Sequence, residues 1–305
     1  MAFTAQDVKT LRELTGCGMM DCKKALTETD GDQDKAVEYL REKGLSKAAK
    51  KAGRIAAEGM VKTYIADGVG VVVEVNSETD FVAKNVDFQN FVADIATTVA
   101  ETNPADVEDL KTKTISGGSQ NVGDALTEKI ATIGENMNIR RFERMESAGT
   151  IVDYIHAGGK IGVLVNAEAQ ESDAVKECLK NVAMQIAALN PKYLSSAEVP
   201  EDYKEHEKEI LMAQAKNDPK NASKPDNIIE KMITGRLNKE LKEVCLLEQE
   251  YVKASNKETV AKYIEQAAKE TGSAITLKSF VRFETGEGIE KKQDDFASEV
   301  ASMIK

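Results

Sequence analysis

Residues 60–76 read MVKTYIADGVGVVVEVN, and residues 150–166 read TIVDYIHAGGKIGVLVN. The two stretches match at a constant offset of 90, from Tyr64 and Tyr154 to Asn76 and Asn166. Each copy has a Tyr-Ile pair, then a glycine-containing turn, then an apolar run rich in valine. This order predicts two β-strands joined as a hairpin with a loop of several residues. The chain therefore contains a structural unit that occurs twice.

The repeat extends beyond the hairpins. FQNFVADIATTVAETNP (88–104) and VKECLKNVAMQIAALNP (175–191) both have apolar residues at helical spacing and both end in Asn-Pro. Further on, Arg-Phe-Glu occurs at 141–143 and again at 282–284, which predicts a third strand in each unit. The fold class is therefore α+β, with one core unit at 59–146 and the other at 147–199 together with 249–305.

The second unit is interrupted between residues 200 and 248. Apolar residues recur there at spacings of three and four, on both sides of a turn that contains Pro219 and Pro225. Proline cannot continue a helix, so the pattern predicts two helices instead of one. We expect residues 200–248 to form an inserted antiparallel helical hairpin.

The first 45 residues predict a compact module of three short helices. Thr4 and Asp7 have the spacing of a helix cap, and Val8, Leu11 and Leu14 form an apolar stripe behind it. The glycines around Cys17 break the first helix, and Gly44 is expected to end the third. Residues 46–58 are rich in alanine and lysine, which is typical of a solvated linker with helical tendency.

Composition limits the possible partners and locations. A chain of 305 residues with 52 acidic and 41 basic residues has a net charge of −11, which disfavours nucleic acid and anionic membranes as partners. Four scattered cysteines and the absence of a long apolar run favour a cytoplasmic protein that does not span a membrane. The chain begins with helix-capping residues instead of the pattern of a signal peptide.

The sequence offers little catalytic chemistry. It lacks a phosphate-binding loop, because Gly158-Gly159-Lys160 has neither the preceding glycine loop nor the following hydroxyl. Cys17 and Cys22 have no partner ligands at zinc-site spacing. The two histidines are His156, for which a turn role and a contact role are equally open, and His206, in a charged helix. We therefore expect no enzyme activity, no cofactor and no nucleotide site.

The connection after the first hairpin is longer than its counterpart. Eleven residues, 77–87, join Asn76 to the helix, whereas eight residues, 167–174, suffice in the second unit. The three extra residues fall within SETDFVAKNVD (77–87), so the second unit folds without a Thr-Asp-Phe triplet there. A projecting functional loop is favoured over the alternative, in which the phenylalanine is simply buried.

Several segments together resemble bacterial elongation factor Ts. They are LRELTGCGMMDCKKALTETDGDQDKAVEYLREKGL, AAEGMV, EVNSETDFVAKN, YIHAGGKIGVLV, KPDNIIEKMITGRLNKELKEVCLLEQEYV and GEGIEKKQDDF, and they span nearly the whole chain. The resemblance implies a helical module like ubiquitin-associated (UBA) domains, a core of two repeated subdomains, and a protruding helical hairpin. It also implies a guanine nucleotide exchange factor whose partner is elongation factor Tu.

The same resemblance assigns roles to residues. It implies that Thr79, Asp80, Phe81 and Val82 displace magnesium from the partner GTPase, with Asp80 either hydrogen-bonding or repelling groups near the metal. It further implies partner contacts by Met19 and Met20 and by the turn that contains His156, Gly158 and Gly159. Two positions depart from the family pattern. Gln185 stands where many relatives have histidine, and Cys17 replaces a smaller residue.

Two other classes of function remain open from the residues. One is a non-catalytic adaptor that binds its partners through the UBA-like module. The other is an enzyme that uses Cys17 or Cys22, which would need a strongly lowered thiol pKa.

Overall fold

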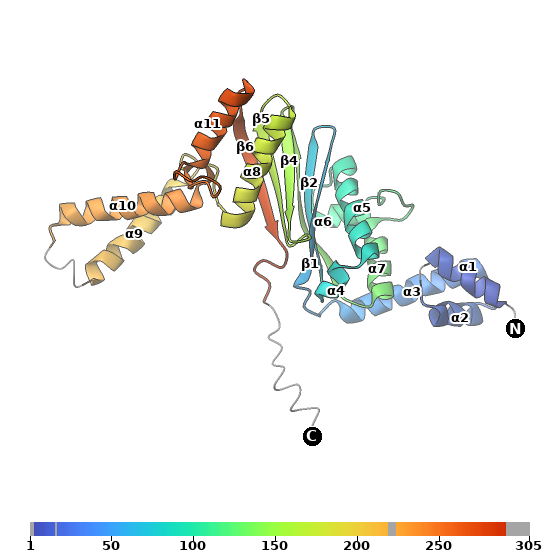
Figure 1. The fold of residues 1–305 in the computed structure, drawn as a ribbon. Coiled ribbons are helices and arrows are strands. Elements are labelled where there is room, and N and C mark those ends of the chain that lie inside the picture. Colours follow the sequence, from blue (N-terminus) through green and yellow to red (C-terminus); the bar gives the residue numbers. More distant parts are fainter. Residues whose placement is uncertain (1–2, 16, 219–223, 291–305) are drawn as a thin grey trace.

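The computed structural model describes residues 3–15, 17–218 and 224–290. Gly16, Pro219 and the stretch 291–305, on which parts of the predictions fall, lie outside the described residues. Figure 1 shows two sheets at the centre of the molecule, with the N-terminal helices on one side and a long helical hairpin on the other.

Two antiparallel sheets of three strands each form the centre of the fold. The strands are β1 (Glu58–Ala66), β2 (Val69–Ser77) and β3 (Met137–Glu146) in one sheet, and β4 (Thr150–His156), β5 (Ile161–Glu168) and β6 (Thr276–Glu284) in the other. Their orders are β1-β2-β3 and β4-β5-β6, so each hairpin receives its third strand from a later segment. The predicted α+β fold with a repeated unit is confirmed.

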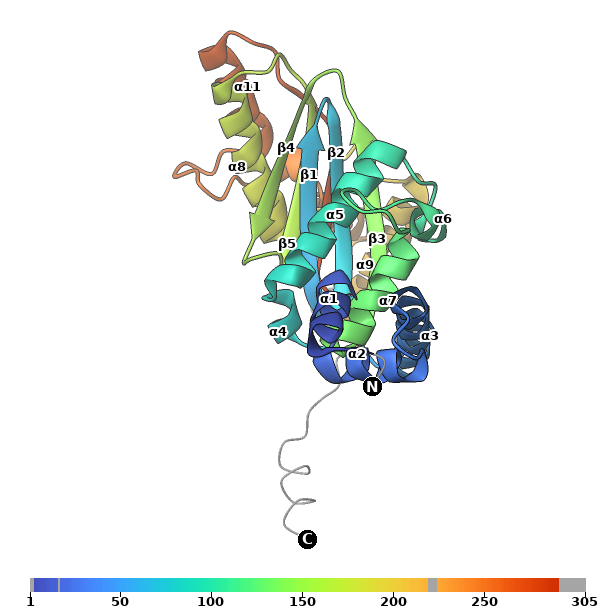
Figure 2. The ribbon, with the colours of Figure 1, turned by 90° about the vertical axis from the view of Figure 1, so that its right-hand side faces the viewer.

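The two sheets pack face to face. Val72 of β2, Leu164 of β5 and Phe283 of β6 lie in one buried cluster between them. Gly162 permits the close approach, because a Cβ atom there would lie 2.4 Å from Cγ1 of Val61. The outer faces are covered by α5 (Val86–Thr102) and α8 (Asp173–Leu189), which contact β1–β2 and β4–β5. Figure 2 shows the resulting helix, sheet, sheet, helix order.

The hairpin turns of the two units differ. Ala66 pairs with Val69, so the first turn has two residues, Asp67 and Gly68, whose φ angles are 50° and 75°. An Asp-Gly pair with two positive φ angles is the favoured chemistry of a tight hairpin turn. The expectation of a longer loop was therefore wrong for this unit. In the second unit His156 pairs with Ile161, and four residues form the loop.

The N-terminal module contains α1 (Ala5–Thr15), α2 (Met19–Glu28) and α3 (Gln33–Lys51). The cap predicted for the first helix is confirmed, since the Thr4 amide donates to Asp7 Oδ2 at 2.6 Å. The stripe prediction was wrong at Leu14, whose side chain is 69% exposed.

The predicted end of the third helix was also wrong. Helix α3 passes Gly44 and includes residues 46–51 of the segment predicted as a linker. Gly44 lies against α7 (Val122–Ile133), where a Cβ atom would be 3.6 Å from that of Ala131. Packing on α7 keeps the helix intact, and tertiary contacts of this kind routinely override the low helix propensity of glycine.

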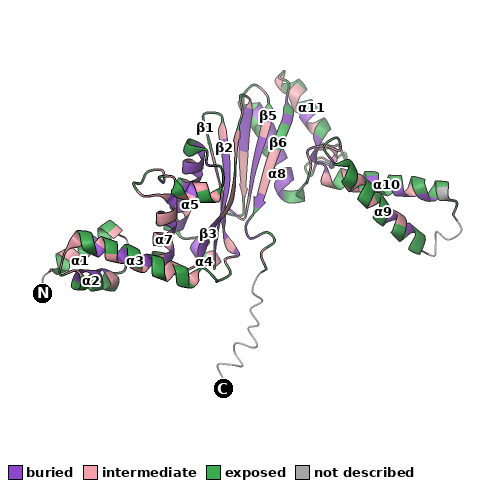
Figure 3. Cartoon of the chain, turned by 180° about the vertical axis from the view of Figure 1, so that it is seen from behind, coloured by how far each residue is buried: buried purple, intermediate pink, exposed green. Residues whose placement is uncertain are grey.

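The insertion in the second unit is an antiparallel pair of helices, α9 (Glu201–Asn217) and α10 (Asp226–Val244). Their facing residues form a small buried cluster that includes Leu211, Ile229 and Ile233, visible as short purple bands in Figure 3. The predicted end at residue 248 was too late. Helix α10 ends at Val244, whose carbonyl accepts from the amides of Lys192 and Tyr193, and a 3-10 turn, η2 (Leu246–Glu248), follows.

The described part of the chain also contains three further helices: α4 (Asp80–Ala83), α6 (Val107–Thr112) and α11 (Val260–Thr271). Among the described residues, every helix is too short or too polar to cross a membrane.

Candidate partner-binding face

The Thr-Asp-Phe-Val segment forms a single helical turn, α4, which is held from a distant part of the chain. Thr79 precedes this turn, and its amide and hydroxyl both donate to the carboxylate of Glu135, at 3.0 and 2.6 Å. The hydroxyl of Ser77 donates to the carbonyl of Thr79 at 3.0 Å. Because Glu135 lies in the segment between α7 and β3, the start of α4 is fixed by contacts that the local sequence does not contain.

Successive residues of α4 face opposite environments. Val82 is buried in the core of the first unit, in the same cluster as Met60 and Phe88. Phe81 points outward and is 79% exposed, whereas Phe88 is fully buried. Exposing a large aromatic side chain to water costs free energy. An aromatic residue that a fixed backbone holds in solvent is therefore typical of a binding surface.

Asp80 lies beside Phe81 on the exposed side of α4. Its carboxylate accepts from Lys84 Nζ at 2.7 Å, and the same ammonium lies 5.9 Å from the centre of the Phe81 ring. The hydrogen bond from Lys84 holds the pKa of Asp80 below its usual range, and the charge of Lys160 acts in the same direction. Asp80 is therefore an ionised acceptor on this surface near neutral pH.

The turn between β4 and β5 presents His156. Its side chain is exposed, and Nδ1 lies 3.1 Å from the hydroxyl of Tyr154. The next three residues, Ala157 to Gly159, have φ angles of 47°, 66° and 103°. A side chain at Gly159 would be strained, because φ is 103° and a Cβ atom would lie 3.1 Å from the carbonyl of Val61. The Val61 amide donates to the Gly159 carbonyl at 2.7 Å.

The structure brings α4 and this turn to the same end of β1. Met60 of β1 shares the buried cluster of Val82, and its Cε would be 3.2 Å from a Cβ atom on Gly159. Lys160, the last residue of the turn, pairs with Glu58 at the start of β1. Segments that lie about 75 positions apart in the sequence therefore form one face.

Met19 and Met20 lie elsewhere, in the first turn of α2. They are 60% and 75% exposed, on the N-terminal module and apart from α4 in Figure 1. The module contacts the core where α3 packs on α7, and Arg41 pairs there with Asp124 at 2.8 Å. The structure thus adds a second exposed apolar surface but does not join it to the α4 face.

Sequence reasoning missed the contacts of Glu135 and Lys160. Glu135 belongs to no motif that was recognised, and Lys160 was considered only as part of a phosphate-binding loop. Gln185, which stands where many relatives have histidine, is fully buried. The Gln185 side chain donates to Gln249 at 3.1 Å and accepts from the Val252 amide at 2.9 Å. Those bonds are internal to the second unit.

The cysteines do not support the thiol-enzyme alternative. Burial raises the pKa of both Cys17 and Cys22, whereas a nucleophilic thiol needs a lowered pKa. The part of the chain that the structure describes also contains no group of three or more His, Cys, Asp or Glu side chains arranged to hold a metal ion.

Comparison with known proteins identifies the family. A family model described as Elongation factor TS matches residues 78–287. The chain belongs to the elongation factor Ts family. Curated relatives named elongation factor Ts include those of Clostridium perfringens (strain 13 / Type A), 54% identical over 305 residues and covering 99% of both chains. The Clostridium botulinum (strain Alaska E43 / Type E3) relative is 53% identical over 306 residues and also covers 99% of both.

Membership of the elongation factor Ts family places this chain among translation elongation factors. The matched residues include the whole of α4, the His156 turn and the hairpin helices.

Proposed function

We propose that this protein is a guanine nucleotide exchange factor that acts on elongation factor Tu. It binds the GDP-bound form, dislocates the magnesium ion, and promotes release of GDP and its exchange for GTP. The observation that carries the proposal is the exposed Phe81 beside an ionised Asp80 on an anchored helical turn. The elongation factor Ts identity of the chain supports the choice of partner.

The energetic requirement is simple. A GTPase holds its nucleotide through a phosphate-binding loop and a magnesium ion that bridges phosphate oxygens. A nanomolar complex corresponds to about 12 kcal/mol, so GDP leaves slowly on its own. A factor that binds the nucleotide-free form more tightly than the GDP form weakens GDP binding by the same ratio. Incoming nucleotide then displaces the factor. The factor therefore speeds exchange without changing the final ratio of bound GDP to bound GTP.

Phe81 fits the role of a wedge. An aromatic side chain that enters an apolar slot in a partner can contribute a few kcal/mol at the centre of an interface. Val82 and Glu135 fix α4 from both sides, so little conformational freedom is lost on binding. We assign Thr79 to the cap of this turn and Val82 to its anchor.

Asp80 supplies charge at the same place. Its carboxylate can accept hydrogen bonds from the partner or repel its acidic magnesium ligands, and either action weakens the metal site. Lys84 occupies the carboxylate in the free protein, through an exposed ion pair. Exposed pairs of this kind contribute little free energy, so the partner can replace Lys84 at low cost.

The remaining contacts are assigned to two surfaces. His156, Gly158 and Gly159 contact the partner beside α4, and Met19 and Met20 provide a separate apolar anchor. Nucleic acid and membranes are not proposed as partners, in line with the net charge of −11. No cofactor is needed, and a cytoplasmic location follows from the proposed role in translation.

The test is the rate of GDP release from elongation factor Tu. The GTPase is loaded with fluorescent GDP, chased with excess unlabelled GDP, and followed with and without this protein. The proposal predicts acceleration of at least 100-fold, about 2.7 kcal/mol on the barrier. An unchanged rate, with or without binding of the two proteins, would contradict it, and binding alone would favour the adaptor alternative.

A further inference from the structure

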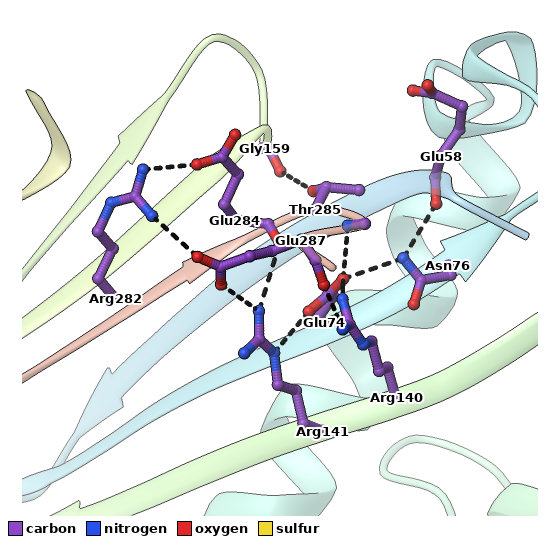
Figure 4. Close-up of polar contacts among 11 residues, drawn as sticks. Glu58, Glu74, Asn76, Arg140, Arg141, Gly159, Arg282, Glu284, Thr285 and Glu287 are labelled. Carbon is purple, nitrogen blue, oxygen red and sulfur yellow. Dashed lines mark hydrogen bonds and ion pairs between the residues drawn. The ribbon is translucent and has the colours of Figure 1, made fainter. Parts of the chain in front are cut away.

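Glu74 is a fully buried acid that the proposed exchange mechanism does not use. It lies in the middle of β2, and its carboxylate accepts from Arg140 Nη1 at 3.0 Å, Arg141 Nε at 2.6 Å and Asn76 Nδ2 at 3.0 Å (Figure 4). A buried charge is tolerated only when it is paired and hydrogen-bonded, as it is here. Because Glu74 lies between the two sheets, its carboxylate can fix a segment of the second core unit in place.

One more donor to Glu74 comes from the other core unit. The amide of Gly286, two residues beyond β6, donates to Oε1 of Glu74 at 2.7 Å. Gly286 has a φ of 72°, and a Cβ atom there would lie 2.1 Å from the carbonyl of Ala57, so only glycine fits. Next to it, Glu287 accepts from Arg141 at 3.1 Å through its carboxylate. The segment after β6 is thus fixed against the first sheet.

Thr285 immediately precedes these two anchors and reaches the His156 turn. Its side chain is 8% exposed, and its hydroxyl donates to the carbonyl of Gly159 at 2.9 Å. Its amide donates to the carbonyl of Lys160 at 2.9 Å. Figure 4 shows Thr285 between Gly159 and the residues that surround Glu74. A chain of contacts therefore runs from the buried carboxylate to the turn.

We propose that Thr285, held in place by Glu74 through Gly286, is a positioning residue that sets the His156 turn for the partner. The inference rests on the proposed function, in which that turn contacts elongation factor Tu. Ala157 has a φ of 47°, a strained value for a residue with a side chain, which persists only where the surrounding structure fixes it. Ordering a flexible turn during binding costs conformational entropy and weakens the complex. A turn that is already ordered in the free protein avoids this cost.

Thr285→Val tests the inference with a minimal change. Valine has nearly the same shape, keeps the backbone bond to Lys160 and removes only the hydroxyl bond to Gly159. We expect the concentration for half-maximal GDP release to rise about 5- to 10-fold while the maximal rate stays within twofold, because α4 is untouched. Thr285→Ser restores the hydroxyl and should return the half-maximal concentration to within twofold of the wild-type value.

A matched control separates this role from a loss of stability. Thr271→Val also removes a threonine hydroxyl bond, a part-buried one to the carbonyl of Ala267 at 2.8 Å, but it lies at the end of α11. Its half-maximal concentration should equal that of the wild type. A Thr285→Val protein with wild-type half-saturation, or a Thr285→Ser protein as weak as the valine variant, would overturn the inference.

Amide hydrogen exchange of the isolated protein gives a reading that needs no partner. In Thr285→Val, the amides of residues 156–160 should exchange about 10-fold faster, while those of β2 stay unchanged. Unchanged exchange in the turn would contradict the inference by itself. If the wild type did not accelerate GDP release at all, the proposed function would fail, while exchange in the turn would still decide whether Thr285 orders it.

Discussion

Three phenylalanines lie within eleven residues of one another, yet only one of them faces solvent. Phe88 and Phe91 are at most 2% exposed in the core, whereas Phe81 is 79% exposed. Hydrophobicity alone predicts all three to be buried. The comparison of the two repeats predicted the difference, because the second unit connects its strand and helix without a counterpart of Phe81. The role of Phe81 in exchange stays a proposal.

Asp80 is predicted to act in exchange without contributing to the fold. Asp80→Ala should slow GDP release from elongation factor Tu by about 10-fold or more and leave the denaturant midpoint unchanged, because its ion pair with Lys84 is exposed. Asp87→Ala is the control, since Asp87 is also exposed near α4 and should preserve the rate. Equal effects of the two substitutions would argue against a specific role for Asp80.

Glu74 predicts a dependence of stability on pH. Burial raises its pKa, but the bonds from the Gly286 amide, Asn76, Arg141 and Arg140 outweigh that effect, and the net pKa is below 4.5. A lowered folded pKa stabilises the protein above the unfolded pKa, and this contribution is lost as pH falls through the folded value. Glu74→Gln should therefore cost about 2 kcal/mol at pH 7, the scale of a hydrogen bond to a charged group.

The difference in unfolding free energy between wild type and Glu74→Gln should shrink as the pH falls below about 4. Urea unfolding of both proteins between pH 3 and pH 7 measures it. Glu248→Gln serves as the control, because Glu248 is less buried than Glu74. A difference that stays constant with pH would show that the Glu74 carboxylate is not ionised in the folded protein.

At the scale of the elements, the repeat was readable from sequence but the registers were not. The two Arg-Phe-Glu segments look equivalent in the sequence, yet Phe142 pairs with Val73 while Phe283 pairs with Gly162. Because Val73 corresponds to Val163 in the repeat, the two registers differ by one residue. A slip of one residue moves a side chain to the other face of a sheet. Phe283 consequently lies between the sheets, whereas Phe142 lies against the helix-covered core of the first unit.

Long-range contacts explain the other differences from the sequence predictions. Gly44 stays helical because of α7, and Glu135 holds Thr79, the residue before α4, from 56 positions away. Neither contact is encoded locally. For the chain as a whole we propose an N-terminal module that extends through α3 to Lys51, a short linker from there to β1, core units at 59–146 and at 147–199 with 249–305, and an inserted hairpin that ends at Val244.

The hairpin is predicted to be dispensable for folding of the core. Its buried cluster, which includes Leu211, Ile233 and Leu237, is separate from that of the second unit. Replacing residues 206–240 with a short Gly/Ser link keeps Tyr203, which contacts Tyr193, and Val244, which accepts from the 192–193 amides. Differential scanning calorimetry should still show one cooperative transition. A broad transition without a heat-capacity peak would place the hairpin in the folding core.

At the scale of the whole molecule, the hairpin and the N-terminal module extend from opposite sides of the paired sheets (Figure 1). The α4 face and the His156 turn lie at one end of these sheets, near the module and not near the hairpin tip. A partner can therefore contact α2, α4 and the turn from one side. Rigid face-to-face packing of the two sheets fixes the distance between α4 and the turn.

The isolated protein is predicted to bind neither GDP nor GTP, since its sequence has no phosphate-binding loop. Isothermal titration with each nucleotide should give no site tighter than about 10 μM, which corresponds to about 7 kcal/mol. A tighter site would mean that the protein handles nucleotide itself and would require a different mechanism from partner-driven release.

The most direct test of the central claim measures GDP release and stability on the same preparations of wild type, Phe81→Ala and Val86→Ala. Val86 is also an exposed apolar residue near α4, 65% exposed, and its truncation should change neither property. Phe81→Ala should keep the wild-type denaturant midpoint and lose at least about 10-fold of the release rate, or 1.4 kcal/mol. A Phe81→Ala protein that is stable and fully active would contradict the account, as would one destabilised by the roughly 3–5 kcal/mol expected of a buried phenylalanine.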